Sequence, residues 1–129
     1  MNLVNAMRSS ASGMSAERAR MDLVSVNLAN ANSMTTPFQE AYRRRIAVLS
    51  GGPDGVKIDK FMVDESPLRV EVDPDNEYAD AEGKVYYSNV QPIKEMVDMM
   101  SATRAYEANI AAFNSAKSMA KAAMTIGKA

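Results

Sequence analysis

The last third of the chain, residues 93–126, carries the pattern that most constrains the fold. Apolar or small side chains recur there at alternating steps of three and four residues: Ile93, Met96, Met100, Thr103, Tyr106, Ile110, Phe113, Ala116, Ala120 and Ala123. Such steps keep one stripe of a helix facing a neighbouring helix. A helix over this span is about 50 Å long at 1.5 Å per residue. An element of this length in a chain of 129 residues needs a partner along its length.

Residues 3–31 carry a second helical stripe, and this one has a strict heptad period. Its members are Met7, Met14, Met21 and Leu28. Asn2 is a suitable N-cap for this helix, whereas Gly13 weakens it by about 1 kcal/mol relative to alanine. Because the helix is marginal alone, we predict that the two terminal helices pair as an antiparallel coiled coil. We also predict that their stripes contact other chains.

The middle of the chain has a different character. Asparagine, serine and Pro37 predict a loop after the first helix. Short runs with alternating apolar residues follow at 42–48, 56–63, 68–72 and 85–87, and they predict a small antiparallel sheet. The last helix is expected to begin near Asn89 as its cap, with Pro92 in the first turn.

The predicted fold is therefore mainly α with a small β insertion. We divide it into an N-terminal helix at 1–33, a loop and small β-rich region at 34–88, and a C-terminal helix at 89–129.

Composition excludes several classes of function. The formal net charge is −1, which argues against a nucleic-acid binder. The chain has no cysteine and no histidine, and its glycines form no phosphate-binding loop. We therefore expect no enzyme activity, no cofactor and no metal. No run is apolar enough to span a membrane, and the N-terminus lacks the pattern of a cleaved signal peptide.

Two charged stretches contain residue types that occur in binding sites. Asp73, Asp75 and Glu77 fall at the first three ligand positions of a calcium-binding EF-hand loop, but Tyr78 and Lys84 stand where glycine and glutamate are required. A solvated acidic loop is the better interpretation. The run at 43–45 consists of three arginines that could bind phosphate, but alternation sends them to opposite faces of a strand, so a strand flank is preferred.

Several motifs resemble those of a known family. The stretch at 27–36, which includes Leu28, Ala29, Asn30, Ala31 and Asn32, resembles the N-terminal signature of bacterial flagellar rod and hook proteins. The stretches at 73–85 and 95–109 are similar to segments of proteins that form the proximal part of the flagellar basal-body rod. The second of these contains the run Arg104, Ala105, Tyr106, Glu107, Ala108 and Asn109.

This resemblance implies a structural subunit of the proximal rod, whose terminal helices pack in a helical array that transmits motor torque. It implies export through the flagellar type III apparatus without a cleaved signal peptide, followed by assembly in the periplasmic space. The implied partners are other rod subunits, further copies of the chain and the export apparatus. Nucleic acid, a small-molecule substrate and direct membrane insertion are not expected.

The residues predicted to form the assembly interface come from both stripes. They are Met7, Met14, Met21, Leu28, Ile93, Met96, Met100, Tyr106, Ile110 and Phe113. An alternative interpretation of the same stripes is a soluble coiled-coil adaptor or secretion chaperone that binds one partner in a closed complex.

Overall fold

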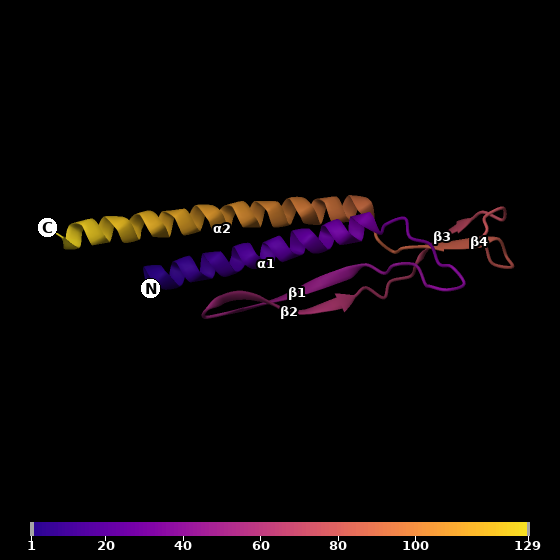
Figure 1. The fold of residues 1–129 in the computed structure, drawn as a ribbon, viewed down its shortest axis with the longest axis horizontal. Helices are drawn as coiled ribbons and strands as arrows, with labels where there is room; N and C mark the ends of the chain where they lie inside the picture. The colour runs from indigo at the N-terminus through magenta and orange to yellow at the C-terminus, as the bar shows by residue number, and fades with distance from the viewer. Residues whose placement is uncertain (1, 129) are drawn as a thin grey trace.

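A computed structural model describes residues 2–128 of the chain. Two long helices flank two pairs of strands in the sequence (Figure 1). The elements are α1 (Leu3–Ala29), β1 (Arg45–Gly52), β2 (Gly55–Val63), β3 (Arg69–Val72), β4 (Lys84–Tyr87) and α2 (Pro92–Gly127). This order confirms the predicted mainly helical fold with short antiparallel strands between the helices.

The two helices pack against each other in opposite directions, with both chain ends at the same pole (Figure 1). Asn27 of α1 donates to Glu95 of α2, and near the other end Gly13 faces Asn109. These two contacts are two heptads apart on each helix, so the helices keep one register between them. The predicted cap of α1 is confirmed, since the Asn2 side chain accepts from the Val4 amide at 2.9 Å.

The face that α2 turns toward α1 differs from the predicted stripe in its first half. Glu95 and Ala102 are buried, whereas Ile93, Met96 and Met100 are exposed. Farther along, Ala116 is buried as the stripe predicted. The first turns are rotated because Glu95, rather than an apolar residue, is held inside by polar partners from α1 and the segment before β1.

The strands β1 and β2 form a hairpin that packs on α1, which lies between this hairpin and α2 in Figure 1. The register slips by one residue after Val48, and Gly55 closes the turn with φ of +114°. The turn rests on α1, because Ser12 accepts from the Val56 amide at 3.0 Å and lies where a Cβ at Gly55 would be. Only glycine fits at this turn.

The strands β3 and β4 form a second, separate hairpin at the pole away from the termini (Figure 1). The segment after α1 binds its edge: the Thr35 amide donates to Tyr86 O at 2.8 Å, and the Ser88 amide donates to Ser33 O at 2.9 Å. Residues 2–128 thus form two two-stranded sheets in place of the one small sheet expected. No helix within residues 2–128 is long and apolar enough to cross a membrane.

Candidate functional site

A cluster of exposed apolar side chains lies at the start of α2. The side chains of Ile93, Met96, Val97 and Met100 share this surface, and each is more than half exposed. Burying large aliphatic side chains contributes about 1.5–3 kcal/mol each. A cluster of four left in water on two helical turns therefore marks a surface where association with another molecule is favourable.

The heptad stripe of α1 lies beside α2, and part of each of its side chains is exposed to solvent. Met7, Met14, Met21 and Leu28 are all half-buried, and Thr103 of α2 donates to the sulfur of Met21 at 3.5 Å. At about 100° per residue, this stripe lies roughly opposite the α1 face formed by Ser12, Ala16 and Ala19. Those three residues line a hollow against β2. The methionine stripe therefore faces away from the β1–β2 hairpin.

The remaining predicted interface residues lie along the second half of α2. Tyr106 and Phe113 are half-buried, and Ile110 is 36% exposed. Beyond Ala116 every residue of the helix except the half-buried Ala120 is exposed, including Met119, Met124 and Ile126. The end of α2 extends past the start of α1 (Figure 1). The ten predicted residues thus do not form one internal seam: four are exposed and six are partly covered within the chain.

The residues of the family-like motifs occupy the ends and the seam of the helix pair. Asn30 caps α1, Ala31 is buried, Leu28 is half-buried, and Ala29 and Asn32 are exposed. In α2, Asn109 packs against Gly13, and Ala105 and Tyr106 are half-buried. Arg104, Glu107 and Ala108 face solvent.

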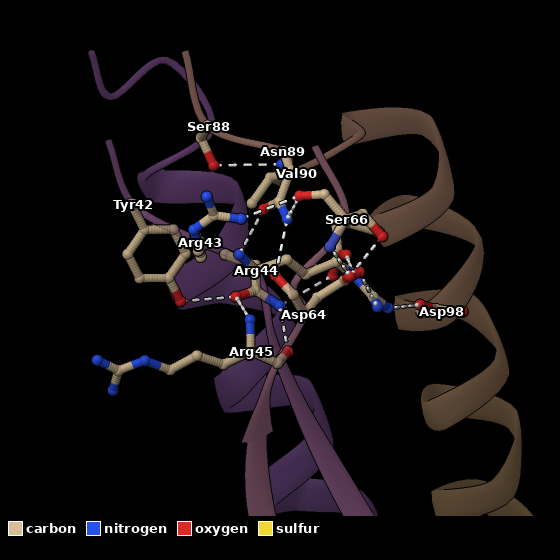
Figure 2. A network of polar contacts seen from close by, with 12 residues as sticks. Tyr42, Arg43, Arg44, Arg45, Asp64, Ser66, Ser88, Asn89, Val90 and Asp98 are labelled. Atoms are coloured by element: carbon tan, nitrogen blue, oxygen red, sulfur yellow. Dashed lines mark hydrogen bonds and ion pairs between the residues drawn. The ribbon is translucent and has the colours of Figure 1, made fainter. Parts of the chain in front are cut away.

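A buried polar junction, centred on Arg44, joins α2 to the base of the β1–β2 hairpin (Figure 2). The Arg44 guanidinium is bound by three carboxylates. Its Nε donates to Glu95, its Nη2 lies 3.1 Å from Asp98 Oδ2, and its Nη1 lies 3.5 Å from Asp64 Oδ2. The Glu95 side chain has no exposed area, and the Arg44 side chain is 13% exposed. A buried ion pair of this kind fixes geometry more than it adds stability, because desolvation offsets much of the attraction.

Two asparagines connect this junction to the backbone. Asn27 of α1 accepts from the Arg45 amide at 3.1 Å and donates to Arg45 O at 2.9 Å, so it pairs with the first residue of β1 as another strand would. Its Oδ1 also accepts from the Tyr42 hydroxyl at 2.7 Å. Asn27 thereby ties the end of α1 to the hairpin.

Asn89 was expected to cap α2, and that expectation is wrong. Gln91 is the N-cap residue of α2, and its side chain makes no capping bond. The Asn89 side chain instead accepts from the Arg44 amide at 2.7 Å and donates to Asp64 O at 2.9 Å. Each described buried side-chain nitrogen or oxygen, in the junction and elsewhere, has a hydrogen-bond partner.

The junction shifts the pKa values of its own groups. Burial alone would lower the pKa of Arg44, but the hydrogen bond to Glu95 and the charges of Glu95, Asp98 and Asp64 raise it above its usual value. The pKa of Asp64 is lowered, first by hydrogen bonds from the side chain and amide of Ser66 and then by Arg44. Both shifts favour the charged forms.

Sequence reasoning missed this junction. Arg44 was interpreted as part of a strand flank, and in the structure it precedes β1 and points at α2. Arg43 pairs with Glu40 at 2.8 Å, and Arg45 lies over the Tyr42 ring. The one available signal was Glu95, a carboxylate that lies between Ile93 and Met96 at the start of the helix. An acid at such a position implies a basic partner elsewhere in the chain.

The acidic stretch of residues 71–82 begins in β3, which ends at Val72, and continues through the loop between β3 and β4. Asp80 folds back on its own turn, accepting from the amides of Glu82 and Lys84 at 2.9 Å each. These bonds, the Lys84 amide first, lower the pKa of Asp80. Within residues 2–128, no group of three or more Asp, Glu, His or Cys side chains is placed to hold a metal ion.

Two family profiles match the chain. The profile described as flagella basal body rod protein matches residues 7–39, which include most of α1. The profile described as flagellar basal body rod FlgEFG protein C-terminal matches residues 81–126, which include β4 and nearly all of α2. Together they cover both helices and the polar junction's contributions from Asn27, Asn89 and Glu95.

Curated relatives match over almost the whole chain. The flagellar basal-body rod protein FlgC of Bacillus subtilis is 39% identical, over 99% of this chain and 100% of its own length. The FlgC protein of Salmonella typhimurium is 36% identical over the same shares. That of Aquifex aeolicus is 42% identical over 91% of each chain. With this identity over two helices and the segments between them, the chain belongs to the FlgC family of flagellar basal-body rod proteins.

Proposed function

We propose that this rod protein is built into the rod by packing its terminal helices against those of other rod subunits and of further copies of itself. The main support for the proposal is the start of α2, which is inverted in the sense that its charged side chain is buried and its aliphatic side chains are exposed. There the carboxylate of Glu95 is inside and Ile93, Met96, Val97 and Met100 are outside. Helices of neighbouring subunits would cover these side chains and the open side of the methionine stripe.

This arrangement gives the helical and the β-rich segments different positions in the proposed rod. Residues 1–33 and 89–129 would form the inner, helical part of the rod, and residues 34–88 would lie outside it. The helices would transmit motor torque, because interlocked side chains between subunits resist sliding. The polar junction suits this role, since it fixes the hairpin to both helices through charged and backbone hydrogen bonds.

Export is also part of the proposal. The chain would leave the cytoplasm through the flagellar export apparatus and assemble in the periplasmic space without loss of a signal peptide. The mass of the protein recovered from assembled rods tests this. An unprocessed mass is expected, and a loss of some twenty N-terminal residues would contradict it.

The central experiment replaces Met100, which is 57% exposed, with aspartate. In a strain whose only FlgC-family protein is this chain, Met100→Asp should abolish rod formation and swimming. The isolated monomer should keep its helix content and urea midpoint, since the side chain lies outside the α1–α2 seam. The matched control is Val72→Asp on β3, at a side chain that is 73% exposed. Normal swimming of Met100→Asp would contradict the proposal.

Sedimentation of the purified protein with its partners separates the rod from the adaptor interpretation. Open-ended growth with other rod proteins supports a rod subunit, whereas a closed complex of fixed stoichiometry supports an adaptor.

A further inference from the structure

One aromatic side chain is almost fully exposed on a turn that hydrogen bonds close. Phe38 is 97% exposed, the highest value of any large apolar side chain within residues 2–128. The turn around it is closed by hydrogen bonds: the Thr36 amide donates to Gln39 O at 2.8 Å, and Thr36 Oγ1 accepts from the amides of Phe38 and Gln39 at 3.3 and 3.2 Å. A ring held out by a preformed turn loses little entropy on binding.

This turn is also tied to the rest of the protein. The Thr35 amide donates to Tyr86 O in β4 at 2.8 Å, and Thr35 Oγ1 accepts from the Ala41 amide at 3.0 Å. The position of the ring is therefore fixed relative to the β3–β4 hairpin. Aromatic side chains presented in this way are typical anchors of protein interfaces.

The same pole of the molecule carries an open hollow of about 660 Å³ at the start of α2. Ala31, Val90, Pro92 and Ile93 give it an apolar lining, to which Arg69 and Lys94 add positive charge. Val90 is buried and forms part of its floor, whereas Ile93 is 79% exposed. The hollow is large enough to receive an aromatic ring together with the residues beside it.

The charges beside the ring and beside the hollow are complementary. Glu40 follows Phe38 by two residues, and its side chain is 58% exposed although it pairs with Arg43. Lys94 makes no salt bridge within residues 2–128, and Arg69 is bound to Glu71 while it lies over the Tyr87 ring. A Phe38 side chain in the hollow would bring an acidic group toward Lys94.

The ring of Phe38 is 97% exposed, so it does not fill the hollow of its own copy. In Figure 1, the segment that links α1 to β1 and the start of α2 both lie at the pole away from the termini. Both features lie at the same pole, so a second copy placed side by side at the same level would bring its ring to the hollow. Each added copy leaves one free ring and one free hollow, so the contact is heterologous and can repeat.

We propose that Phe38 of one copy docks in the hollow formed by Ala31, Val90, Pro92 and Ile93 of a second copy of this chain. This lateral contact rests on the proposed rod function and names one partner within it. The hollow shares Ile93 with the helix surface that continues to Met96 and Met100, but Phe38 belongs to neither, so its substitution tests the contact apart from that surface.

The absence of cysteine from the chain allows a direct test by cross-linking. Gln39→Cys and Lys94→Cys, both at exposed positions, are combined in one chain and expressed as the only FlgC-family protein of the cell. Oxidation of isolated rods should then give covalent dimers and higher multiples. The control combines Gln39→Cys with Ser118→Cys, an exposed position in the second half of α2, and should give no multiples.

Rods that assemble normally but show only the cross-linking of the control would overturn the contact and leave the rod function standing. A cross-link from position 94 to a different rod protein would also overturn it. Failure of the unmodified chain to enter rods at all is a separate result, because that would contradict the proposed function.

A second variant shows whether the ring drives the contact. Phe38→Ala in the background of the paired cysteines should lower the yield of multiples at least about tenfold, as expected for an interface anchor. Phe61→Ala is the matched control, since Phe61 in β2 is 60% exposed. It should change the yield less than about twofold. Equal yields with and without the Phe38 ring would contradict its role.

Discussion

In the first turns of α2, Glu95 lies inside the protein and Ile93 and Val97 lie in solvent. In the middle of the same helix Ala102 is inside, and Arg104 is outside. The middle is arranged as a helix in any small soluble protein would be. The start is inverted, and it is stable in water only because Arg44 and Asn27 satisfy the inner carboxylate. A helix with its charge inside and its aliphatic side chains outside is suited to contact a further apolar surface.

Removing the buried carboxylate of Glu95 from the inverted segment should lower the stability of the monomer most. Glu95→Ala leaves the guanidinium of Arg44 buried with only Asp64 and Asp98 as partners, so unfolding should become easier by about 3 kcal/mol. Urea denaturation of the monomer measures this. Glu107→Ala, at an exposed position of the same helix, should change stability by less than about 0.5 kcal/mol. Equal losses in the two variants would mean that the junction is not buried as described.

The middle of the helix pair is tested by Gly13→Ala. The new Cβ would lie 2.6 Å from Asn109 Nδ2, and that amide is itself bound to Ala105 O at 2.9 Å. Overpacking costs about 1–3 kcal/mol, whereas alanine in a helix gains about 1 kcal/mol over glycine. A net loss of about 1 kcal/mol in thermal or urea unfolding is expected.

The double variant Gly13→Ala with Asn109→Ala provides the control for this close contact. It should be more stable than the sum of the two single effects predicts, because the clash is gone. Strict additivity would show that the two residues do not meet.

A smaller effect is expected from the outer carboxylate of the junction. The pKa of Asp64 is lowered in the folded protein by Ser66 and Arg44, so its contribution to stability is complete above about pH 4, near the ordinary aspartate value. That contribution is lost as the pH falls through the lower folded-state pKa. Asp64→Asn should therefore be less stable than the parent at neutral pH, and the difference in urea midpoint should shrink toward pH 2. A difference that stays constant with pH would contradict the shift.

The smallest effect on the stability of the monomer is expected from the outer face of the inverted segment. Val97→Ala truncates an exposed side chain on the outer face of the inverted segment. The free energy of unfolding, measured by urea denaturation, should therefore change by less than about 0.5 kcal/mol. Incorporation into rods, measured by quantifying the protein in purified basal bodies, should nevertheless fall. A clear loss of monomer stability without a loss of incorporation would show that the face belongs to the chain's own core.

The sequence predicted the elements well where local rules decide them. Heptad spacing and the Asn2 cap identify α1, alternation with Gly55 identifies the first hairpin, and Pro37 identifies the loop. It did not predict which side of α2 faces inward at Glu95, because periodicity assigns apolar side chains to the inside. The buried carboxylate depends on Arg44, which is distant in the sequence, and no local pattern records that pairing.

The function of Asn89 could not be predicted for a similar reason. An asparagine near a helix start is a common cap, but here Pro92 opens the helix and the Asn89 side chain is already used by Arg44 and Asp64. Likewise, alternation alone does not distinguish one four-stranded sheet from two hairpins. That choice depends on Ser12 and Asn27, which hold the first hairpin on α1 and away from β3 and β4.

The contacts between α1 and α2 also determine the order in which the protein can fold. Gly13 meets Asn109 and Asn27 meets Glu95, so the earliest part of the chain to be synthesised finds its main packing partner among the last. Closing such wide loops is slow, and a chain dominated by distant contacts folds late. Until residues 95–109 are synthesised, the face of α1 that packs on α2 stays uncovered, although the β1–β2 hairpin can already cover another face. The packing of α1 on α2 therefore cannot form while the chain is still incomplete.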